Sequence, residues 1–283
     1  MNQINPISVD LPTLMSVIPK PDCPDTFLGE PENYGLIGIY GGHFVGQALA
    51  AGFATIENGK LAQSLHCYFL KTGNPAEPIK YRVERLRDGR ASSTRSITGY
   101  QAGDRVFHMT AAFKLPEPGE THQKSAPEVI GHDELAEKQA SRGKQFKPPM
   151  LVGDRAELLL ISEHFVTPQF EPGRTPELAC WMRSSHKGSI SAQSAQCVLA
   201  FLSDGFLMFN SVLPYGIPFQ THRLTSLDHS VWFHRACAVE DWMLYDQRSI
   251  AAVDGRGLNE GEVFDANGTL ICSTRQESML RKI

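Results

Sequence analysis

The chain repeats one succession of strand and turn signals, and this repeat restricts its possible folds more than any other feature. Ser64-Leu65 opens one strand-like segment, and Ser226-Leu227 opens another. An Asp-Gly-Arg turn follows each of them, at 88–90 and at 254–256. The two copies are offset by 162 residues at the first marker and by 166 residues at the second. This small drift predicts two copies of one unit that differ by a short change in a loop.

Each copy closes with a second turn signal and a strand of period two. The turns are Ala102-Gly103 in the first copy and Asn267-Gly268 in the second. One face of the strand that follows collects Phe107, Met109, Ala111 and Phe113 in the first copy, and Leu270, Cys272, Thr274 and Gln276 in the second. This alternation is typical of strands with one buried face.

Each copy also begins with a helical pattern. In the first copy it is carried by Val45, Leu49, Phe53 and Ile56, between Gly41-Gly42 and Gly59. In the second, Cys197, Phe201, Asp204 and Met208 share one face of a helix predicted over 194–208. One helix followed by strands with Asp-Gly and Asn-Gly turns predicts an α+β unit, in which an antiparallel sheet wraps around a single helix.

The region between the copies has the composition of a linker. Proline, glycine and mixed charges are frequent over 117–150, with a short helical pattern at 134–140. The sequence therefore predicts a first unit over 1–120, a linker over 121–150 and a second unit over 151–283 that carries the candidate catalytic residues. The second unit is expected to start with a strand over 156–166.

Charge and cysteine usage limit the partners and the compartment. The chain of 283 residues has 27 Lys and Arg against 31 Asp and Glu, with both signs interspersed. This balance argues against binding to nucleic acid or to an anionic membrane through overall charge. No apolar run approaches the roughly 18 residues of a membrane span, and no secretory signal is visible. The six cysteines form no Cys-x-x-Cys pair, so free thiols in the cytoplasm are expected.

Three polar residues are candidates for chemistry. Asp204 interrupts an apolar helix, where an ionisable group is costly unless it is paired or functional; the alternative is an exposed carboxylate at the helix end beside Gly205. Gln276 shares the apolar face of its strand, which fits a core glutamine with satisfied partners better than a functional amide. Ser226 lacks a Gly-x-Ser-x-Gly context, so it reads as a strand-end hydroxyl unless other polar groups lie beside it.

Histidine spacing does not indicate a metal site. His229 and His234 fall on opposite faces of an extended chain, and His222 is roughly 40 Å from His234 along a straight strand. His66 and Cys67 also face opposite sides of their strand, so they cannot pair within it, and His66 is expected in the core or in a pocket wall. Gly41-Gly42 at a helix start predicts either close helix packing or backbone N–H groups open to a carbonyl oxygen.

Several motifs in both halves match one known family. They are YGGHFVGQAL at 40–49, SLHCYFL at 64–70, LRDGR at 86–90, FHMTAAF at 107–113, LDHSVWFHR at 227–235 and STRQE at 273–277. Together they resemble the acyl-CoA thioesterase II (TesB-like) family over residues 27–282. The resemblance implies a double hotdog fold and hydrolysis of fatty acyl-CoA thioesters with neither a metal nor an organic cofactor. It also implies a homodimer.

The resemblance assigns the family's catalytic set to Asp204, Ser226 and Gln276. Ser278 departs from the family, which commonly has glycine there, and the stretch 168–192 does not align clearly, which leaves the acyl chain length open. We expect Asp204 to take a proton from a water that Gln276 and Ser226 hold.

Backbone N–H groups of Gly41 and Gly42 are expected to stabilise the oxyanion, and His66 to contribute to substrate binding. Two alternatives stay open at this point. One is a hotdog enoyl-CoA hydratase or dehydratase, whose Gly-Asp-x-Asn-Pro-x-His element has only a partial counterpart in Gly73-Asn74-Pro75. The other is a non-catalytic acyl-CoA-binding protein.

Overall fold

A computed structural model of the protein describes residues 9–35, 38–57, 59–141, 153–162 and 174–283. The first half contains α1 (Leu11–Leu14), β1 (Ile18–Pro19), β2 (Thr26–Gly29), α2 (Gly41–Phe53), β3 (Leu61–Phe69), β4 (Ile79–Asp88), β5 (Ser92–Gln101) and β6 (Asp104–Lys114). The remainder contains α3 (His132–Ser141), η1 (Gly153–Arg155), β7 (Ala156–Leu160), β8 (Glu177–Ser184), α4 (Ala192–Ser203), η3 (Leu207–Phe209), β9 (His222–Ser226), β10 (Asp228–Phe233), β11 (Met243–Val253), β12 (Arg256–Asp265) and β13 (Leu270–Lys282).

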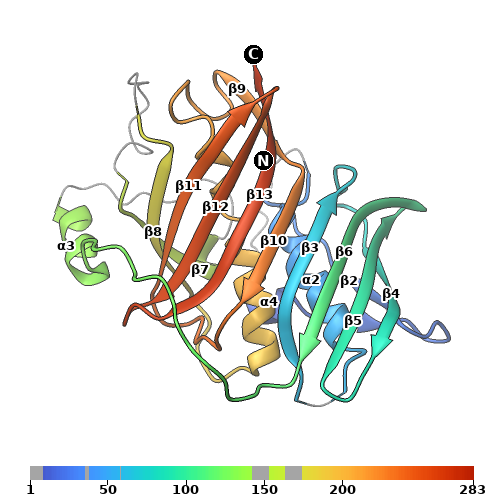
Figure 1. Cartoon of the computed structure of the whole chain (residues 1–283). Helices are drawn as coiled ribbons and strands as arrows, with labels where there is room; N and C mark the ends of the chain where they lie inside the picture. Colours follow the sequence, from blue (N-terminus) through green and yellow to red (C-terminus); the bar gives the residue numbers. More distant parts are fainter. Residues whose placement is uncertain (1–8, 36–37, 58, 142–152, 163–173) are drawn as a thin grey trace.

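The strands join into one antiparallel sheet that runs through both halves (Figure 1). Its order is β1-β2-β4-β5-β6-β3-β10-β13-β12-β11-β8-β7, with β9 added beside β13. The order from β3 outward matches the order from β10 outward, which confirms the internal repeat. The two copies meet where β3 pairs with β10, in a register that sets His66 opposite Ser230. Each copy curls around its own helix, so the α+β prediction and the double hotdog fold are confirmed.

Two of the turns that mark the repeat have the backbone of tight hairpins. Ala102 and Gly103 have φ of 48° and 88°, and Asp254 and Gly255 have φ of 52° and 67°. Two successive residues with positive φ form the two-residue turn whose twist matches that of the flanking strands. Asp-Gly at 254–255 and Ala-Gly at 102–103 therefore fix the registers of β11 with β12 and of β5 with β6.

The last strand of each copy alternates as the sequence pattern predicts. In β6, Phe107, Met109, Ala111 and Phe113 are all fully buried. In β13, the buried row runs through Cys272, Thr274, Gln276 and Ser278. Leu270, which the pattern placed on the same face, lies beyond a bulge, is half-buried and packs against the separate cluster around Leu135. The inward face of β6 is thus apolar, whereas that of β13 carries polar groups that need partners inside the protein.

Both long helices end earlier than the apolar pattern predicts. α2 stops at Phe53, before Ile56, and α4 stops at Ser203 rather than at Met208. The chain after α4 turns sharply because Phe206 has a left-handed backbone with φ of 65°, and η3 begins directly after it. The hydrophobic period continued across this break, so periodicity alone could not reveal it. As a result, Asp204 caps the helix end instead of lying on a helical face.

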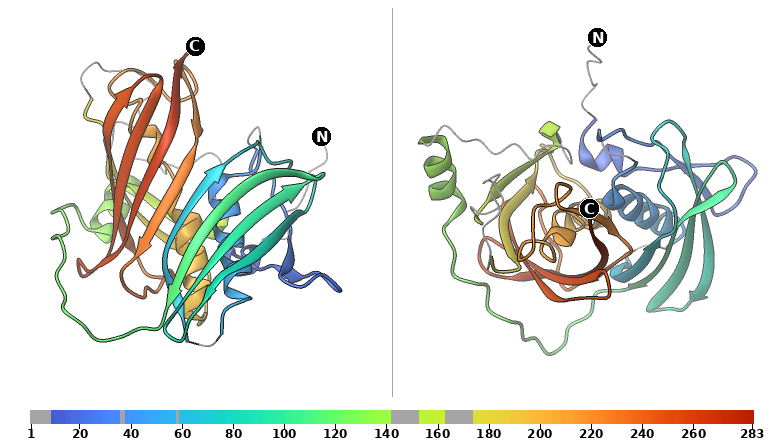
Figure 2. Two further views of the ribbon diagram at one scale, coloured as in Figure 1. Left: turned by 45° about the vertical axis from the view of Figure 1, so that its right-hand side comes forward. Right: turned by 90° about the horizontal axis from the view of Figure 1, so that it is seen from above.

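The two helices lie side by side inside the curved sheet (Figure 2). Glycines on α2 allow its backbone to approach α4. A Cβ atom on Gly42 would lie 2.3 Å from the carbonyl oxygen of Phe201, and one on Gly46 would lie 2.9 Å from that of Cys197. Real Cβ atoms do not approach other atoms as closely as 2.3 Å, so close packing is one use of the glycines at this helix start, as predicted.

The segment between the copies is attached to the second one. Trp181 donates from Nε1 to the carbonyl oxygen of Ile130 at 2.9 Å, and Leu135 of α3 is buried against the same sheet. The predicted helix over 134–140 is therefore present as α3, somewhat longer than expected. The strand predicted over 156–166 is β7 as far as Leu160, and 163–166 lie outside the described residues. Within the described ranges, no helix is both long and apolar enough to cross a membrane.

Candidate active site

Asp204 lies in the interior, at the point where the two copies meet. It caps the C-terminal end of α4 and is only 6% exposed. Its Oδ1 atom accepts a hydrogen bond from Nε2 of Gln276 at 2.5 Å, and its carboxylate also accepts the backbone N–H of Gly42 at the start of α2. The alternative of an exposed carboxylate beside Gly205 is therefore wrong. The structure brings two of the three candidate residues into direct contact.

Burial changes the acidity of this carboxylate. It raises the pKa of Asp204 to about 6, because the charged form loses its hydration inside the protein. The hydrogen bonds from Gln276 and from the Gly42 N–H act in the opposite direction, since they stabilise the ionised form. A carboxylate with this pKa is ionised at neutral pH and is a stronger base than a solvated aspartate.

The Gln276 side chain is held with its nitrogen towards the acid. Nε2 donates to Asp204 and lies 3.4 Å from Nδ1 of His229. Its Oε1 atom is buried and has no hydrogen-bond partner among the described residues. A buried acceptor without a partner costs free energy, which makes it a natural place for a water or a substrate group.

His229 is a site residue that the sequence patterns considered only as a metal ligand. It is fully buried on β10, and its Nε2 atom lies 2.9 Å from Oγ of Ser203, the last residue of α4. Burial lowers the pKa of His229 to about 3, so the ring is neutral. The signal was available, because His229, Val231 and Phe233 alternate along one face of the strand. The parity argument had only placed His229 on the strand face opposite His234, and it could not identify its neighbours.

Ser226 ends β9 and contacts neither Asp204 nor Gln276 by a hydrogen bond in the described structure. Its hydroxyl donates to the sulfur of Met208 at 3.7 Å, and its register partner on β13 is Ser278. Gln276 is the next inward-facing residue along that strand. Diagonal positions of this kind have Cβ atoms roughly 7–8 Å apart, a gap that a single water can bridge.

Ser278 is itself fully buried and adds to the polar lining. Its hydroxyl donates to the carbonyl oxygen of Gly257 at 3.3 Å and accepts from Nδ2 of Asn259 at 3.4 Å. Asn259 is the register partner of Gln276 on β12, and its Oδ1 atom is a second buried acceptor that lacks a described partner. The serine thus belongs to a polar layer that extends beyond the acid.

The two glycines at the start of α2 have different surroundings. The N–H of Gly42 is used by Asp204, so it is not open to a substrate oxygen in this structure. A Cβ atom on Gly41 would lie 2.7 Å from Oδ2 of Asp204 and 2.9 Å from the ring of Phe69. The absence of side chains at both positions is what lets the acid lie against the helix start.

His66 lies away from this group, and its expected place in the core or in a pocket wall is wrong. It is exposed on β3, where its Nδ1 atom is 3.1 Å from Oγ of Ser230 and its ring meets the edge of Trp232. Its neighbour Cys67 is buried on the opposite face, as strand parity predicts. No described contact joins His66 to Asp204.

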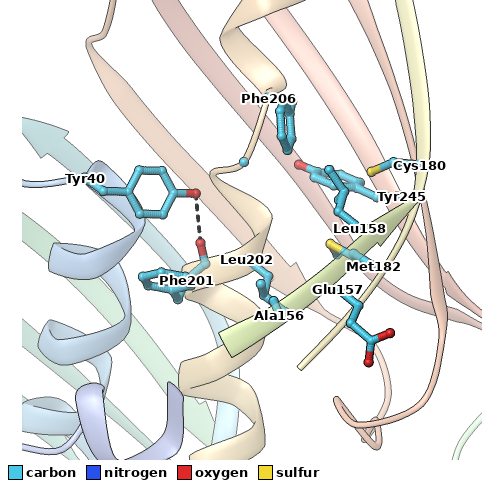
Figure 3. Close-up of a pocket in the computed structure, with 11 residues that line it drawn as sticks. Tyr40, Ala156, Glu157, Leu158, Cys180, Met182, Phe201, Leu202, Phe206 and Tyr245 are labelled. Atoms are coloured by element: carbon cyan, nitrogen blue, oxygen red, sulfur yellow. Dashed lines mark hydrogen bonds between the residues drawn. The ribbon is translucent and has the colours of Figure 1, made fainter. Parts of the chain in front are cut away.

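A small apolar pocket with a cavity volume of about 30 Å³ lies beside the turn after α4 (Figure 3). Its wall is built from α4 and the following turn on one side and from β7, β8 and β11 on the other. The lining includes Leu158, Met182, Leu202, Phe206 and Tyr245. Gly205 lines it too, directly after Asp204, so the pocket begins one residue from the acid.

Metal ligation has no support in the described part of the chain. Among those residues, no three side chains of the types His, Cys, Asp and Glu are grouped so that they could hold an ion.

Comparison with known proteins gives consistent matches over both copies. The family model of the acyl-CoA thioesterase N-terminal domain matches residues 30–114, and that of the acyl-CoA thioesterase C-terminal domain matches 134–280. Acyl-CoA thioesterase 2 of Haemophilus influenzae is 31% identical, covering 90% of this chain and 92% of its own. Human acyl-coenzyme A thioesterase 8 is 32% identical, covering 86% of this chain and 80% of its own.

A solved structure gives the same result. The acyl-CoA thioesterase II TesB2 from Mycobacterium marinum superposes with a TM-score of 0.79 and 27% identity, and the match covers 96% of this chain and 98% of that one. Matches of this extent include both copies of the repeat and the elements that carry Asp204 and Gln276. The chain therefore belongs to the acyl-CoA thioesterase family of thioester hydrolases.

Proposed function

We propose that this protein hydrolyses fatty acyl-CoA to a free fatty acid and CoA, with Asp204 as the general base. The observation that carries the proposal is the buried carboxylate with a pKa of about 6, bonded to an amide whose Oε1 atom has no described partner. A water beside these two groups would meet two acceptors, one on Asp204 and one on Gln276. Both of its hydrogens would be engaged, and a lone pair would be left to attack.

The reaction needs little else, because a thioester carbonyl is electrophilic and a thiolate leaves readily. The water oxygen forms a bond to the carbonyl carbon while Asp204 accepts a proton. The carbon–sulfur bond then breaks, and the proton on Asp204 returns to the departing sulfur. Holding the water at a fixed angle supplies the positioning part of the catalysis, and the carboxylate supplies the general-base part.

Ser226 and Gly41 complete the proposed machinery. Ser226 would hold the same water by rotating its hydroxyl from Met208 towards Gln276, which a serine side chain can do without moving the backbone. The N–H of Gly41, in the first turn of α2, would meet the developing oxyanion with the positive end of the helix dipole.

The proposal is tested by replacing the base. Asp204→Asn should lower kcat by about 10² to 10⁴-fold, since that is the usual contribution of a general base. The measurement is release of free thiol from saturated acyl-CoAs of short, medium and long chain. Asp246→Asn is the matched control, because Asp246 is another half-buried carboxylate with a raised pKa, but it lies outside this group. An Asp204→Asn enzyme with near-normal turnover would exclude the assigned base.

Two other functions predict different results in the same assay. A hydratase would change the absorbance of crotonyl-CoA without releasing thiol, and a binding protein would do neither. The partial hydratase motif, 73–75, lies in the loop between β3 and β4 and not on a central helix. A homodimer in the cytoplasm is also part of the proposal. The molar mass in solution tests the oligomeric state.

A further inference from the structure

His229 and Ser203 form a hydrogen-bonded chain that ends at the Gln276 amide. We infer that His229 is a positioning residue, which fixes the orientation of Gln276 so that its Oε1 atom faces the reacting water. The inference deepens the proposed function and rests on it. It follows from counting the hydrogens that each polar atom of the chain can donate.

The count begins at the helix end. The Ser203 hydroxyl has one hydrogen and donates it to the carbonyl oxygen of Ala200 at 3.0 Å. A carbonyl oxygen can only accept, so the direction of this bond is fixed. One hydrogen cannot serve two contacts, so in this arrangement the contact of 2.9 Å between the same hydroxyl oxygen and Nε2 of His229 is donated by the histidine. His229 therefore carries its hydrogen on Nε2.

The tautomer decides what the other ring nitrogen can do. The ring is neutral, because burial lowers the pKa of His229 to about 3. With the hydrogen on Nε2, the Nδ1 atom has a lone pair and can only accept. Its neighbour at 3.4 Å is the Gln276 amide, and only the NH₂ end of that amide can donate to it.

Two acceptors thus require the same end of the amide. Nε2 of Gln276 has two hydrogens, and one goes to Oδ1 of Asp204 while the other goes to Nδ1 of His229. A flipped amide would place Oε1 against a carboxylate oxygen and a ring lone pair, which repels on both sides. Asp204 and His229 therefore each oppose the flip, and the unpartnered Oε1 atom stays on the side of the amide that neither of these two acceptors occupies.

The consequence for catalysis is specific. If only Asp204 held the amide, protonation or movement of that carboxylate would free Gln276 to rotate. His229 keeps the amide in place independently of the acid, because its own tautomer is set from the helix end by Ser203. Loss of the Nδ1 acceptor should then misplace the water and lower kcat, with little change in KM.

A pair of substitutions separates this role from simple packing. His229→Asn retains an acceptor oxygen where Nδ1 lies but cannot reach Ser203. His229→Gln can reach Ser203 but has no acceptor at the position of Nδ1. We expect His229→Gln to lower kcat by about 10²-fold, the usual cost of a misplacement near 1 Å, and His229→Asn to lose on the order of tenfold. Equal losses in the two variants, or no loss in His229→Gln, would overturn the inference.

A second measurement needs no substrate and no folded variant. In the wild-type protein labelled with ¹⁵N-histidine, long-range proton–nitrogen spectra at pH 8 report which ring nitrogen carries hydrogen. The His229 signal is the one that is absent from the spectrum of His229→Asn. If that variant does not fold, two rings should stay neutral down to pH 5, those of His43 and His229. Nε2 of His43 lies 3.0 Å from the carbonyl oxygen of Glu30, so that ring also carries its hydrogen on Nε2, and both signals should show this form. Hydrogen on Nε2 supports the inference, and hydrogen on Nδ1 overturns it. This result is independent of turnover, so it remains decisive even if Asp204→Asn disproves the proposed base.

Discussion

At the scale of single residues, the acidity of Asp204 connects burial to activity. Its pKa of about 6 is set by desolvation and is moderated by the bonds from Gln276 and from the Gly42 N–H. The base is active only when ionised. Both the pH dependence of the rate and the pH dependence of stability follow from this one group.

The first prediction concerns the rate. We expect kcat/KM for thioester hydrolysis to rise about tenfold per pH unit below pH 6 and to level off above it, because the deprotonated fraction of Asp204 increases in this range. The profile is measured by thiol release between pH 4.5 and pH 8. Enzyme held at each pH and assayed at pH 7.5 serves as the control for unfolding. A midpoint near 4 would contradict the buried environment of the acid.

The second prediction concerns stability. The folded-state pKa of Asp204 lies above its ordinary value of 3.8, so the folded protein binds the proton more tightly than the unfolded chain. Its contribution is therefore fully present below pH 3.8 and is lost as the pH rises through 6. Relative to Asp204→Asn, the wild-type protein should lose about 2 kcal/mol of unfolding free energy between pH 4 and pH 7. Urea titrations of both proteins measure the difference, and a pH-independent difference would contradict the shift.

The residues of the site were predictable to different degrees. Asp204 stood out because it interrupts an apolar segment, and Gln276 because it continues an apolar row. Their contact was not predictable, since it depends on how far α4 runs before the turn at Phe206. Parity placed His229 only on the strand face opposite His234, and its inferred role depends on the direction of the Ser203 hydrogen bond, about which a sequence contains no information. The catalytic part of Ser226 stays a prediction.

At the scale of elements, the approach of α2 to α4 builds the site. The start of α2 supplies an N–H from Gly42, and the end of α4 supplies Asp204. The helices come this close because Gly42 and Gly46 have no side chains. The hairpin turns were predictable from Asp-Gly and Asn-Gly signals, whereas the helix ends were not, because the apolar period continued past them.

The third prediction tests this contact. Gly42→Ala places a Cβ atom 2.3 Å from the carbonyl oxygen of Phe201, which forces the helices apart. We expect a loss of about 1–3 kcal/mol in unfolding free energy, together with a lower kcat as the N–H withdraws from Asp204. Gly119→Ala is the matched control, since a Cβ atom there meets nothing within 4 Å. Thermal unfolding and thiol release measure both effects; an unchanged melting temperature for Gly42→Ala would contradict the packing.

At the scale of the whole molecule, one sheet and one main core span the two copies. The principal buried cluster contains residues of both, including Phe44 and Phe107 from the first and Phe201 and Val231 from the second. The repeat and its α+β class were predictable from the shared order of helix, strand and turn signals. The pairing of β3 with β10 was not, because nothing in a repeat states which strands of its copies are neighbours.

The fourth prediction is that the two copies unfold together. All three tryptophans, Trp181, Trp232 and Trp242, belong to the second copy, so their fluorescence reports on that copy. Phe44→Ala removes a buried ring of the first copy that stacks on Phe107, at a cost of about 3–5 kcal/mol. We expect the tryptophan-detected melting temperature to fall by several degrees. If the tryptophan transition stays unchanged in Phe44→Ala, the two copies unfold independently.

The tandem arrangement has a further consequence for the pairing of helix ends. Asp204 caps α4, whereas Ala54 caps α2. When the two copies are aligned on the turns at 102–103 and 267–268, Ala111 of the first copy corresponds to Gln276 of the second. Two identical chains related by a rotation axis would have to duplicate every substitution, acid and amide included. Covalent fusion removes that obligation: the first copy lends its helix start and has alanine where the second has glutamine, while the second holds the buried acid and the amide, so that each can mutate under a separate selective pressure.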